Sequence, residues 1–202
     1  MDKEIIIDRV ADILKDTPSA EQIVKKGDNR HKRFRILARY MVEKAIEKDA
    51  LILESDGLGI AILFETFPNE KENFWKESKE NLNLLFNVTG FKNALKILKN
   101  QKYIQQQRPK EGAYLYCWFW GIVQNSRGTD SKVGRYMKDR FLKIAERDKL
   151  PLYAETQTKK NVIVYRRYGF ELFHTWKRDD GNTMWFLRYI PKSLGGIGDP
   201  NL

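Results

Sequence analysis

The segment AYLYCWFWGIV at residues 113–123 constrains the fold more than any other part of the chain. In an extended strand, successive side chains point to opposite faces, and this run is apolar at both sets of positions. A strand built from it must therefore be covered on both faces. A polar segment, QNSRGTDS, comes next. It leads into a predicted helix whose apolar residues recur every three or four positions: Val133, Met137, Phe141, Ile144 and Ala145. This pattern predicts a strand inside a sheet that carries helices on both faces.

The segments that follow continue to alternate between strand and helix. Leu150-Pro151 leads into a short strand, LYAETQ, at 152–157. Thr158 is placed to cap a helix that ends at Tyr168, with Gly169 as its C-terminal stop. Two further strands, FELFHTWK at 170–177 and TMWFLRYI at 183–190, flank a turn at 179–182.

The first fifty residues are predicted to be helical. Thr17 and Pro18 mark the start of one helix, as N-cap and first helical residue. Two apolar stripes at helical spacing lie before and after it: Ile6, Val10, Ile13 and Leu14, then Phe34, Leu37, Met41 and Ala45. The strand-like runs at 50–55 and 58–67 are joined by Asp56-Gly57, which is typical of a tight hairpin turn.

Two helices are predicted between this hairpin and the buried strand. The first spans about 70–87, and Thr89-Gly90 separates it from a second with Phe91, Leu95 and Leu98 on one face. RPKEG at 108–112 is predicted to be a loop. We expect one domain over 1–192 with a helical insertion at about 70–107, and a flexible tail at 193–202. The element order predicts an α/β (α+β) fold with a mixed sheet.

The charge of the chain favours anionic partners. Its 37 Lys and Arg against 27 Asp and Glu give a net charge of +10, which suits nucleic acid or a phosphorylated cofactor. The densest basic patch is typical of a solvated helix face: Lys25, Lys26, Arg30, Lys32, Arg33 and Arg35. The aromatic residues gather in apolar strands and do not alternate with cations, so a nucleic-acid partner is disfavoured.

The apolar runs, the cysteine and the histidines limit the class of protein further. The first twenty residues carry charges at regular intervals, and no run of about 18 apolar residues occurs, so we expect a cytoplasmic protein without a membrane span. Cys117 is the one cysteine, which excludes an intrachain disulfide, and its apolar neighbours indicate an inert core thiol. His31 and His174 lie far apart, so no metal site is expected.

Three segments resemble the GNAT superfamily of N-acetyltransferases. They are SRGTDSKVG at 126–134, LPLYAETQTKKN at 150–161 and NVIVYRRYGF at 161–170. The family signature has a strand, a Gln/Arg-x-x-Gly-x-Gly/Ala loop, a helix, and a later Asn-x-x-x-Tyr segment closing on Gly-Phe. The resemblance covers residues 113–190, and the hairpin matches weakly. It implies a mixed, mostly antiparallel sheet whose central parallel pair is splayed.

The resemblance also implies a cofactor and a reaction. Acetyl-CoA would be the co-substrate, and its acetyl group would pass directly to a primary amine of a small molecule. A helix N-terminus suits the pyrophosphate, because its free backbone N–H groups and the positive end of the helix dipole attract an anion. The implied coenzyme-binding residues are Gly121, Ile122, Val123, Arg127, Gly128, Thr129, Ser131, Lys132, Val133, Gly134, Asn161 and Tyr165. Asn161 and Tyr165 are four residues apart, so they share one helix face.

Two residues are candidates for catalysis. Tyr165 is the candidate acid that protonates the departing thiolate, and its alternative is a core tyrosine packed near Phe170. Glu155 is the candidate base, and its alternative is a solvated or ion-paired strand carboxylate. A backbone N–H near Ile122 or Val123 would stabilise the oxyanion.

The loop departs from the family pattern at Asp130, where a second glycine or alanine is expected. Two alternatives therefore stay open: a non-catalytic protein that binds acyl-CoA, and a basic module associated with nucleic acid. No motif identifies the acceptor. Five aromatic residues are compatible with an apolar or aromatic acceptor and equally with core packing: Phe74, Trp75, Phe91, Trp118 and Trp120. A monomer and a homodimer are both compatible with the sequence.

Overall fold

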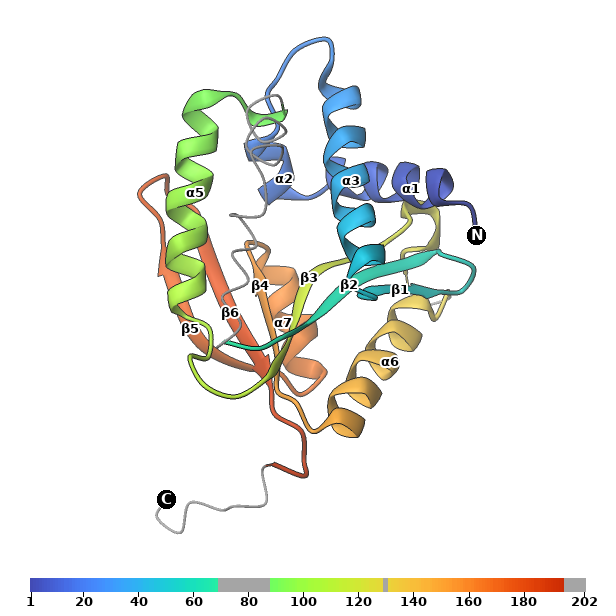
Figure 1. Cartoon of the computed structure of the whole chain (residues 1–202), viewed down its shortest axis with the longest axis vertical. Coiled ribbons are helices and arrows are strands. Elements are labelled where there is room, and N and C mark those ends of the chain that lie inside the picture. The colour runs from blue at the N-terminus through green and yellow to red at the C-terminus, as the bar shows by residue number, and fades with distance from the viewer. Residues whose placement is uncertain (69–87, 129–130, 195–202) are drawn as a thin grey trace.

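A six-stranded sheet in the order β1-β2-β3-β4-β6-β5 forms the centre of the structure (Figure 1). The computed structural model describes residues 1–68, 88–128 and 131–194. The strands are β1 (Leu51–Glu54), β2 (Gly59–Thr66), β3 (Tyr114–Ile122), β4 (Leu152–Thr156), β5 (Glu171–Lys177) and β6 (Thr183–Tyr189). In this part of the chain β3 and β4 are the one parallel pair, and every other neighbouring pair is antiparallel. The predicted mixed, mostly antiparallel sheet is confirmed.

The parallel pair diverges toward its carboxyl end. β3 and β4 are in register at only three pairs: Leu115–Leu152, Tyr116–Tyr153 and Cys117–Ala154. Beyond them β3 stays paired with β2 as far as Ile122, while β4 stays paired with β6 as far as Thr156. The central strands therefore separate after three residue pairs, which confirms the splayed pair.

A β-bulge lies on β3 where the divergence begins. Cys117 pairs with Leu63 and Phe119 pairs with Ile62, which leaves Trp118 as an extra residue. Side chains alternate between faces along a strand, and an extra residue reverses that alternation. Trp118 and Phe119 consequently pack with the same core cluster, on the opposite side from Cys117 and Trp120.

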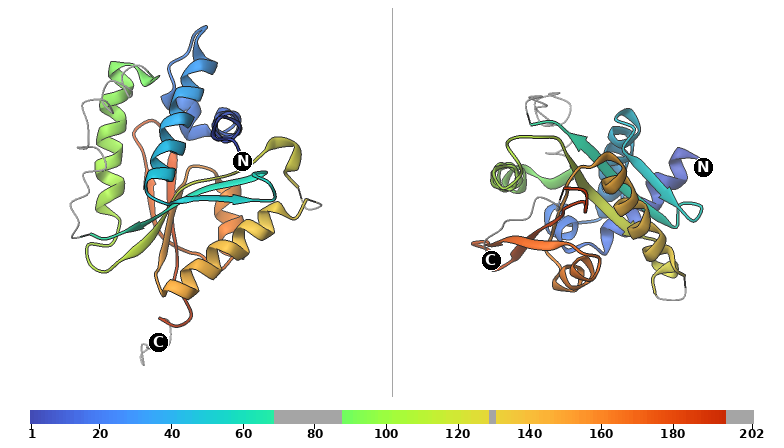
Figure 2. Two further views of the ribbon diagram at one scale, coloured as in Figure 1. Left: turned by 45° about the vertical axis from the view of Figure 1, so that its right-hand side comes forward. Right: turned by 90° about the horizontal axis from the view of Figure 1, so that it is seen from below.

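Helices cover both faces of the sheet (Figure 2). On one face lie α1 (Lys3–Lys15), α2 (Pro18–Ile23), α3 (Arg30–Glu47) and α5 (Phe91–Gln106). On the other lie α6 (Val133–Asp148) and α7 (Lys159–Arg167), with a short 3-10 turn, η1 (Gln124–Ser126), before α6. The predicted order of elements is confirmed for the described residues. In the described part of the chain, no helix has the length and apolarity needed to cross a bilayer.

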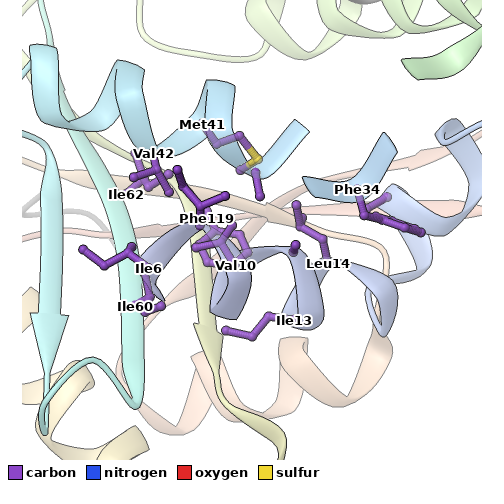
Figure 3. Packing of buried hydrophobic residues seen from close by; sticks show 14 of the residues in the cluster. Ile6, Val10, Ile13, Leu14, Phe34, Met41, Val42, Ile60, Ile62 and Phe119 are labelled. Carbon is purple, nitrogen blue, oxygen red and sulfur yellow. The ribbon is translucent and has the colours of Figure 1, made fainter. Parts of the chain in front are cut away.

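The N-terminal helices form because their apolar stripes are buried against the sheet. The stripe of α1 packs with Phe34 and Met41 of α3 and with Phe119 of β3 (Figure 3). α1 approaches β3 closely at Gly121, where an added Cβ would overlap the side chain of Ile13. The glycine is thus required for this packing.

The hairpin of β1 and β2 is confirmed, but its turn is longer than a two-residue turn. β1 ends at Glu54 and β2 begins at Gly59. Ser55, Asp56 and Gly57 all have positive φ, at 50°, 53° and 73°. Asp56-Gly57 therefore lies inside a four-residue connection.

α5 is the described part of the predicted insertion. Ile104 packs with Met184 and Phe186 of β6, and Tyr103 stacks on Trp176 of β5 with ring centroids 4.0 Å apart. The predicted helix at about 70–87, with Phe74 and Trp75, lies outside the described residues, as does the tail from 195 onward. The boundaries 1–192 and 193–202 stay predictions.

Candidate active site

The divergence of β3 and β4 opens a cavity of about 310 Å³. Residues of both strands line it, together with residues of α2, α3, α5 and α7. Glu155, Asn161 and Tyr165 are among them, so three of the residues singled out in the sequence meet in one cavity. The residues of the loop before α6 are not among its lining residues. Their part in binding stays a prediction.

Tyr165 is a packed core tyrosine that also lines the cavity, and its role as an acid stays a prediction. Its ring packs against Trp120 and Phe170, with centroids 5.5 Å and 5.0 Å away, and the residue also lines the cavity. Burial raises the pKa of the Tyr165 phenol well above its ordinary value. The hydroxyl is therefore protonated at neutral pH and can act as a proton donor.

Asn161 lies one helical turn before Tyr165, near the start of α7. Its Nδ2 donates to the hydroxyl of Thr156, at 3.3 Å, and the N–H of Thr158 donates to the same hydroxyl at 3.1 Å. Thr158 is the N-cap residue, and Gly169 follows the helix with φ of 91°. These bonds join the end of β4 to α7 and fix Asn161 at the cavity.

Glu155 forms an ion pair with Arg108, with Nε and Oε1 3.3 Å apart. Both side chains are largely buried, at 10% and 15% exposure. The Arg108 guanidinium also lies 3.5 Å from the ring centroid of Tyr116. The sequence suggested this ion-paired state as the alternative for Glu155, and its role as a base stays a prediction. Arg108 itself was predicted only as part of a loop.

Gln157 was not identified from the sequence. It lines the same cavity, directly after β4. Its side-chain oxygen, Oε1, is buried and accepts no hydrogen bond from the described residues. A buried acceptor without a donor is unusual and destabilising, so it indicates a position where a ligand supplies the donor.

The loop between β3 and α6 is braced by its own polar groups. Ser131 Oγ donates to the carbonyl oxygen of Ser126 at 2.6 Å. Gly128 has φ of 133°, and an added Cβ there would contact nothing within 4 Å. Thr129 and Asp130 lie outside the described residues. The predicted departure from the family pattern at Asp130 is therefore not described by the structure.

The N-terminus of α6 is suited to an anion. Lys132 is its N-cap residue, with φ of 53°, and no side chain caps this end. The first turn carries no acidic residue. Tyr136 N–H donates to Lys132 O at 3.0 Å, so the amides of Val133, Gly134 and Arg135 precede the helical hydrogen bonds. These amides and the helix dipole make the turn electropositive.

Arg127 ties the loop to the sheet and to α1. Its Nε donates to Ile122 O at 2.9 Å, and its guanidinium lies 2.9 Å from the carboxylate of Asp16. The N–H of Val123 donates to Leu58 O at 2.9 Å. Because N–H groups alternate in direction along a strand, the N–H of Ile122 points away from β2, toward the open side of the pair. Of the two backbone N–H groups predicted to stabilise the oxyanion, that of Ile122 therefore has the better direction.

The remaining cysteine and histidines have no role in the proposed chemistry. Cys117 also lines the cavity, but it is buried, and burial raises the pKa of its thiol to about 12. His174 Nε2 lies 2.9 Å from the hydroxyl of Tyr103, and His31 is exposed on α3. The described residues contain no group of three His, Cys, Asp or Glu that could hold a metal ion. In the basic patch, Arg30 pairs with Glu21.

Comparisons with known proteins were made at three levels. No protein-family model matches the chain, and no curated protein matches its sequence. Solved structures do resemble it. A histone acetyltransferase HPA2 and related acetyltransferase from Corynebacterium glutamicum is 18% identical, with a TM-score of 0.67 over 94% of this chain and 91% of that chain.

Two mosquito proteins are also similar. Arylalkylamine N-acetyltransferase 2 from Aedes aegypti is 12% identical, with a TM-score of 0.60 over 94% of this chain and 96% of that chain. A mosquito arylalkylamine N-acetyltransferase like 5b is 11% identical, with a TM-score of 0.58 over 91% and 94%. The chain therefore has the fold of the GNAT acetyltransferases.

Proposed function

We propose that this protein is an N-acetyltransferase that moves the acetyl group of acetyl-CoA to a primary amine of a small molecule. The observation that carries the proposal is the cavity between the diverging ends of β3 and β4, with Asn161 and Tyr165 on its wall. In an α/β sheet, ligands bind at the carboxyl ends of parallel strands where connections diverge. The fold shared with acetyltransferases supports the same assignment.

The chain offers groups for each part of the coenzyme. The uncapped amides at the start of α6 suit the diphosphate. Gly128, in the loop before α6, has no side chain that would obstruct its approach. Lys132 adds positive charge beside them, Arg127 is proposed to contribute although it also pairs with Asp16, and Ser131 braces the loop. Asn161 is proposed to bond the amides of the pantetheine arm where it passes between β3 and β4.

Transfer needs three groups around the thioester. The nitrogen of the amine forms a bond to the carbonyl carbon, and the N–H of Ile122 is proposed to stabilise the oxygen that becomes negative. The carbon–sulfur bond then breaks. Tyr165 donates its phenolic proton to the sulfur, which leaves as the thiol. The products are the acetylated amine and coenzyme A, and the proton taken from the nitrogen returns through solvent to the Tyr165 phenolate.

Glu155 is proposed to receive the proton that the nitrogen loses. The ammonium ion has no lone pair, so the amine must first lose a proton to solvent. After attack the nitrogen is positively charged and strongly acidic. A carboxylate already paired with Arg108 can accept this proton, and Glu155 is the carboxylate among the described residues that line the cavity.

The names of similar structures support an amine acceptor and differ in its nature. One is called a histone acetyltransferase, and two are called arylalkylamine N-acetyltransferases. Since the likeness is one of fold, the choice between acceptors depends on this chain's own cavity.

Calorimetry with acetyl-CoA, followed by a thiol-release assay over a panel of primary amines, tests the proposal. Binding and amine-dependent thiol release are expected. Binding without release on any amine would indicate a non-catalytic acyl-CoA-binding protein. Absence of binding would refute the proposal, and salt-sensitive retention on DNA or RNA would then support the nucleic-acid alternative.

A further inference from the structure

We propose that the acceptor is an apolar amine with a single positive charge, and that Gln157 binds its nitrogen through the side-chain oxygen. This rests on the proposed function and deepens it, because it names the class of acceptor and a residue that selects it. Three features of the cavity support it: its apolar walls, its neutralised carboxylate and its unused hydrogen-bond acceptor.

The cavity extends from the catalytic end toward the helices of the opposite face. Asn161 and Tyr165 of α7 form one end, where the thioester is placed by the proposed function. The other walls come from α2, α3, α5, the segment just before α5, and β6. They are mainly apolar, and they include Leu37, Met41, Val88, Ile97, Ile104 and Met184. Such walls favour an apolar body on the acceptor.

The charge of the cavity disfavours a cation that the acceptor keeps during the reaction. The reacting nitrogen loses its proton before attack, whereas a second ammonium group would stay charged. Glu155 is the only carboxyl group among the described lining residues, and Arg108 already neutralises it at 3.3 Å. A second ammonium group would lose its water without gaining a counter-charge, which is costly. This disfavours polyamines and lysine-rich peptides as acceptors.

A neighbouring cavity of about 340 Å³ has the same preference. It shares Gln101, Tyr116 and Trp118 with the first cavity, so the two adjoin. Its described lining residues include four cations and no acid: Lys44, Lys48, Arg108 and Lys110. Lys44 pairs with Glu47 and Arg108 with Glu155. The described lining residues hold no carboxylate that could pair with a second ammonium group, so a polycationic acceptor gains no counter-charge here either.

Gln157 supplies the specific contact. Its buried Oε1 can only accept a hydrogen bond, whereas the thioester oxygen and sulfur have no proton to donate. Close to the thioester, the donors available from the two substrates are the N–H groups of the amine and those of the pantetheine amides. We assign the amine, because Asn161 is already proposed to bond the pantetheine amides and because Gln157 lies two residues after Glu155, the proposed proton acceptor, in the same cavity.

An acceptor panel tests the class of amine. The probes are 2-phenylethylamine and 3-methylbutylamine as apolar monoamines, with spermidine and a lysine-rich peptide as polycations. We expect kcat/KM to be about tenfold higher or more for the apolar monoamines. Preference for spermidine or the peptide would overturn the inference and leave the proposed function intact. Acetyl-CoA binding without acetylation of any of these probes would overturn the inference, and thiol release over the wider amine panel would then show whether the proposed function fails as well.

A variant tests the role of Gln157. Gln157→Leu keeps the approximate volume and removes the acceptor oxygen, and exposed Gln106→Leu on α5 is the matched control. We expect Gln157→Leu to lower kcat/KM for 2-phenylethylamine about fivefold to tenfold, with KM for acetyl-CoA unchanged. Its Tm should stay equal or rise, since an unpartnered buried oxygen is removed. A raised KM for acetyl-CoA with unchanged amine kinetics would assign Gln157 to the coenzyme and overturn the inference.

Discussion

Replacing Tyr165 by phenylalanine separates chemistry from binding. The phenylalanine ring retains the contacts with Trp120 and Phe170, because those involve the ring alone. A general acid contributes about 10²- to 10⁴-fold to a rate. A thiolate leaves readily without help, since thiols have a pKa of about 8.5, so the lower end applies. We expect kcat to fall about 100-fold, or about 2.7 kcal/mol in the barrier.

The assay is thiol release at saturating acetyl-CoA and amine, with calorimetry for coenzyme affinity and thermal unfolding for stability. Coenzyme affinity should change by less than about threefold, and the free energy of unfolding by less than about 0.5 kcal/mol. Tyr168→Phe is the control, because Tyr168 also stacks near Trp120, at 6.1 Å, but does not line the cavity. Unchanged kcat in Tyr165→Phe, or an equal loss in the control, would remove Tyr165 from the acid role.

Three further variants test the loop, the packing of α1 and the charge on the turn after β5. Gly128→Val should weaken acetyl-CoA binding in calorimetry because φ of 133° is strained for valine, while Gly112→Val, at φ of 73°, should not. Gly121→Ala should lower the free energy of unfolding in urea by about 1–3 kcal/mol, through overlap with Ile13. The Lys96 ammonium lowers the pKa of Asp180 to about 2, so its stabilisation is present above its ordinary pKa and is lost as pH falls through about 2. Urea midpoints measured from pH 5 to 2 should fall less steeply in Asp180→Asn.

Much of the fold could be predicted because its segments are strongly periodic. The inward residues predicted for α6 are buried at Val133, Met137, Phe141 and Ala145, since a helix packed on a sheet must keep the 3.6-residue period. The order of strands and helices followed from turn residues such as Gly169. Asn161 and Tyr165 could be placed on one cavity wall because four residues make about one helical turn.

Other features could not be read from the sequence. The bulge at Trp118 leaves no sign in a strand that is apolar on both faces, because register is encoded by polar alternation. Arg108 and Glu155 are far apart in sequence, and a polar loop carries no information about its distant partner. Gln157 was missed for a similar reason. Its lack of a donor depends on what packs around it in three dimensions.

The short register between β3 and β4 has a mechanical consequence. The sheet consists of two three-stranded halves, β1-β2-β3 and β4-β6-β5, whose strands meet at three residue pairs. Backbone amides at this seam should exchange with deuterium faster than those inside either half, since few bonds must open to expose them. A ligand that contacts both halves should hold them together at these three residue pairs. Exchange there should slow more on saturation with acetyl-CoA than it does in β1 or β5.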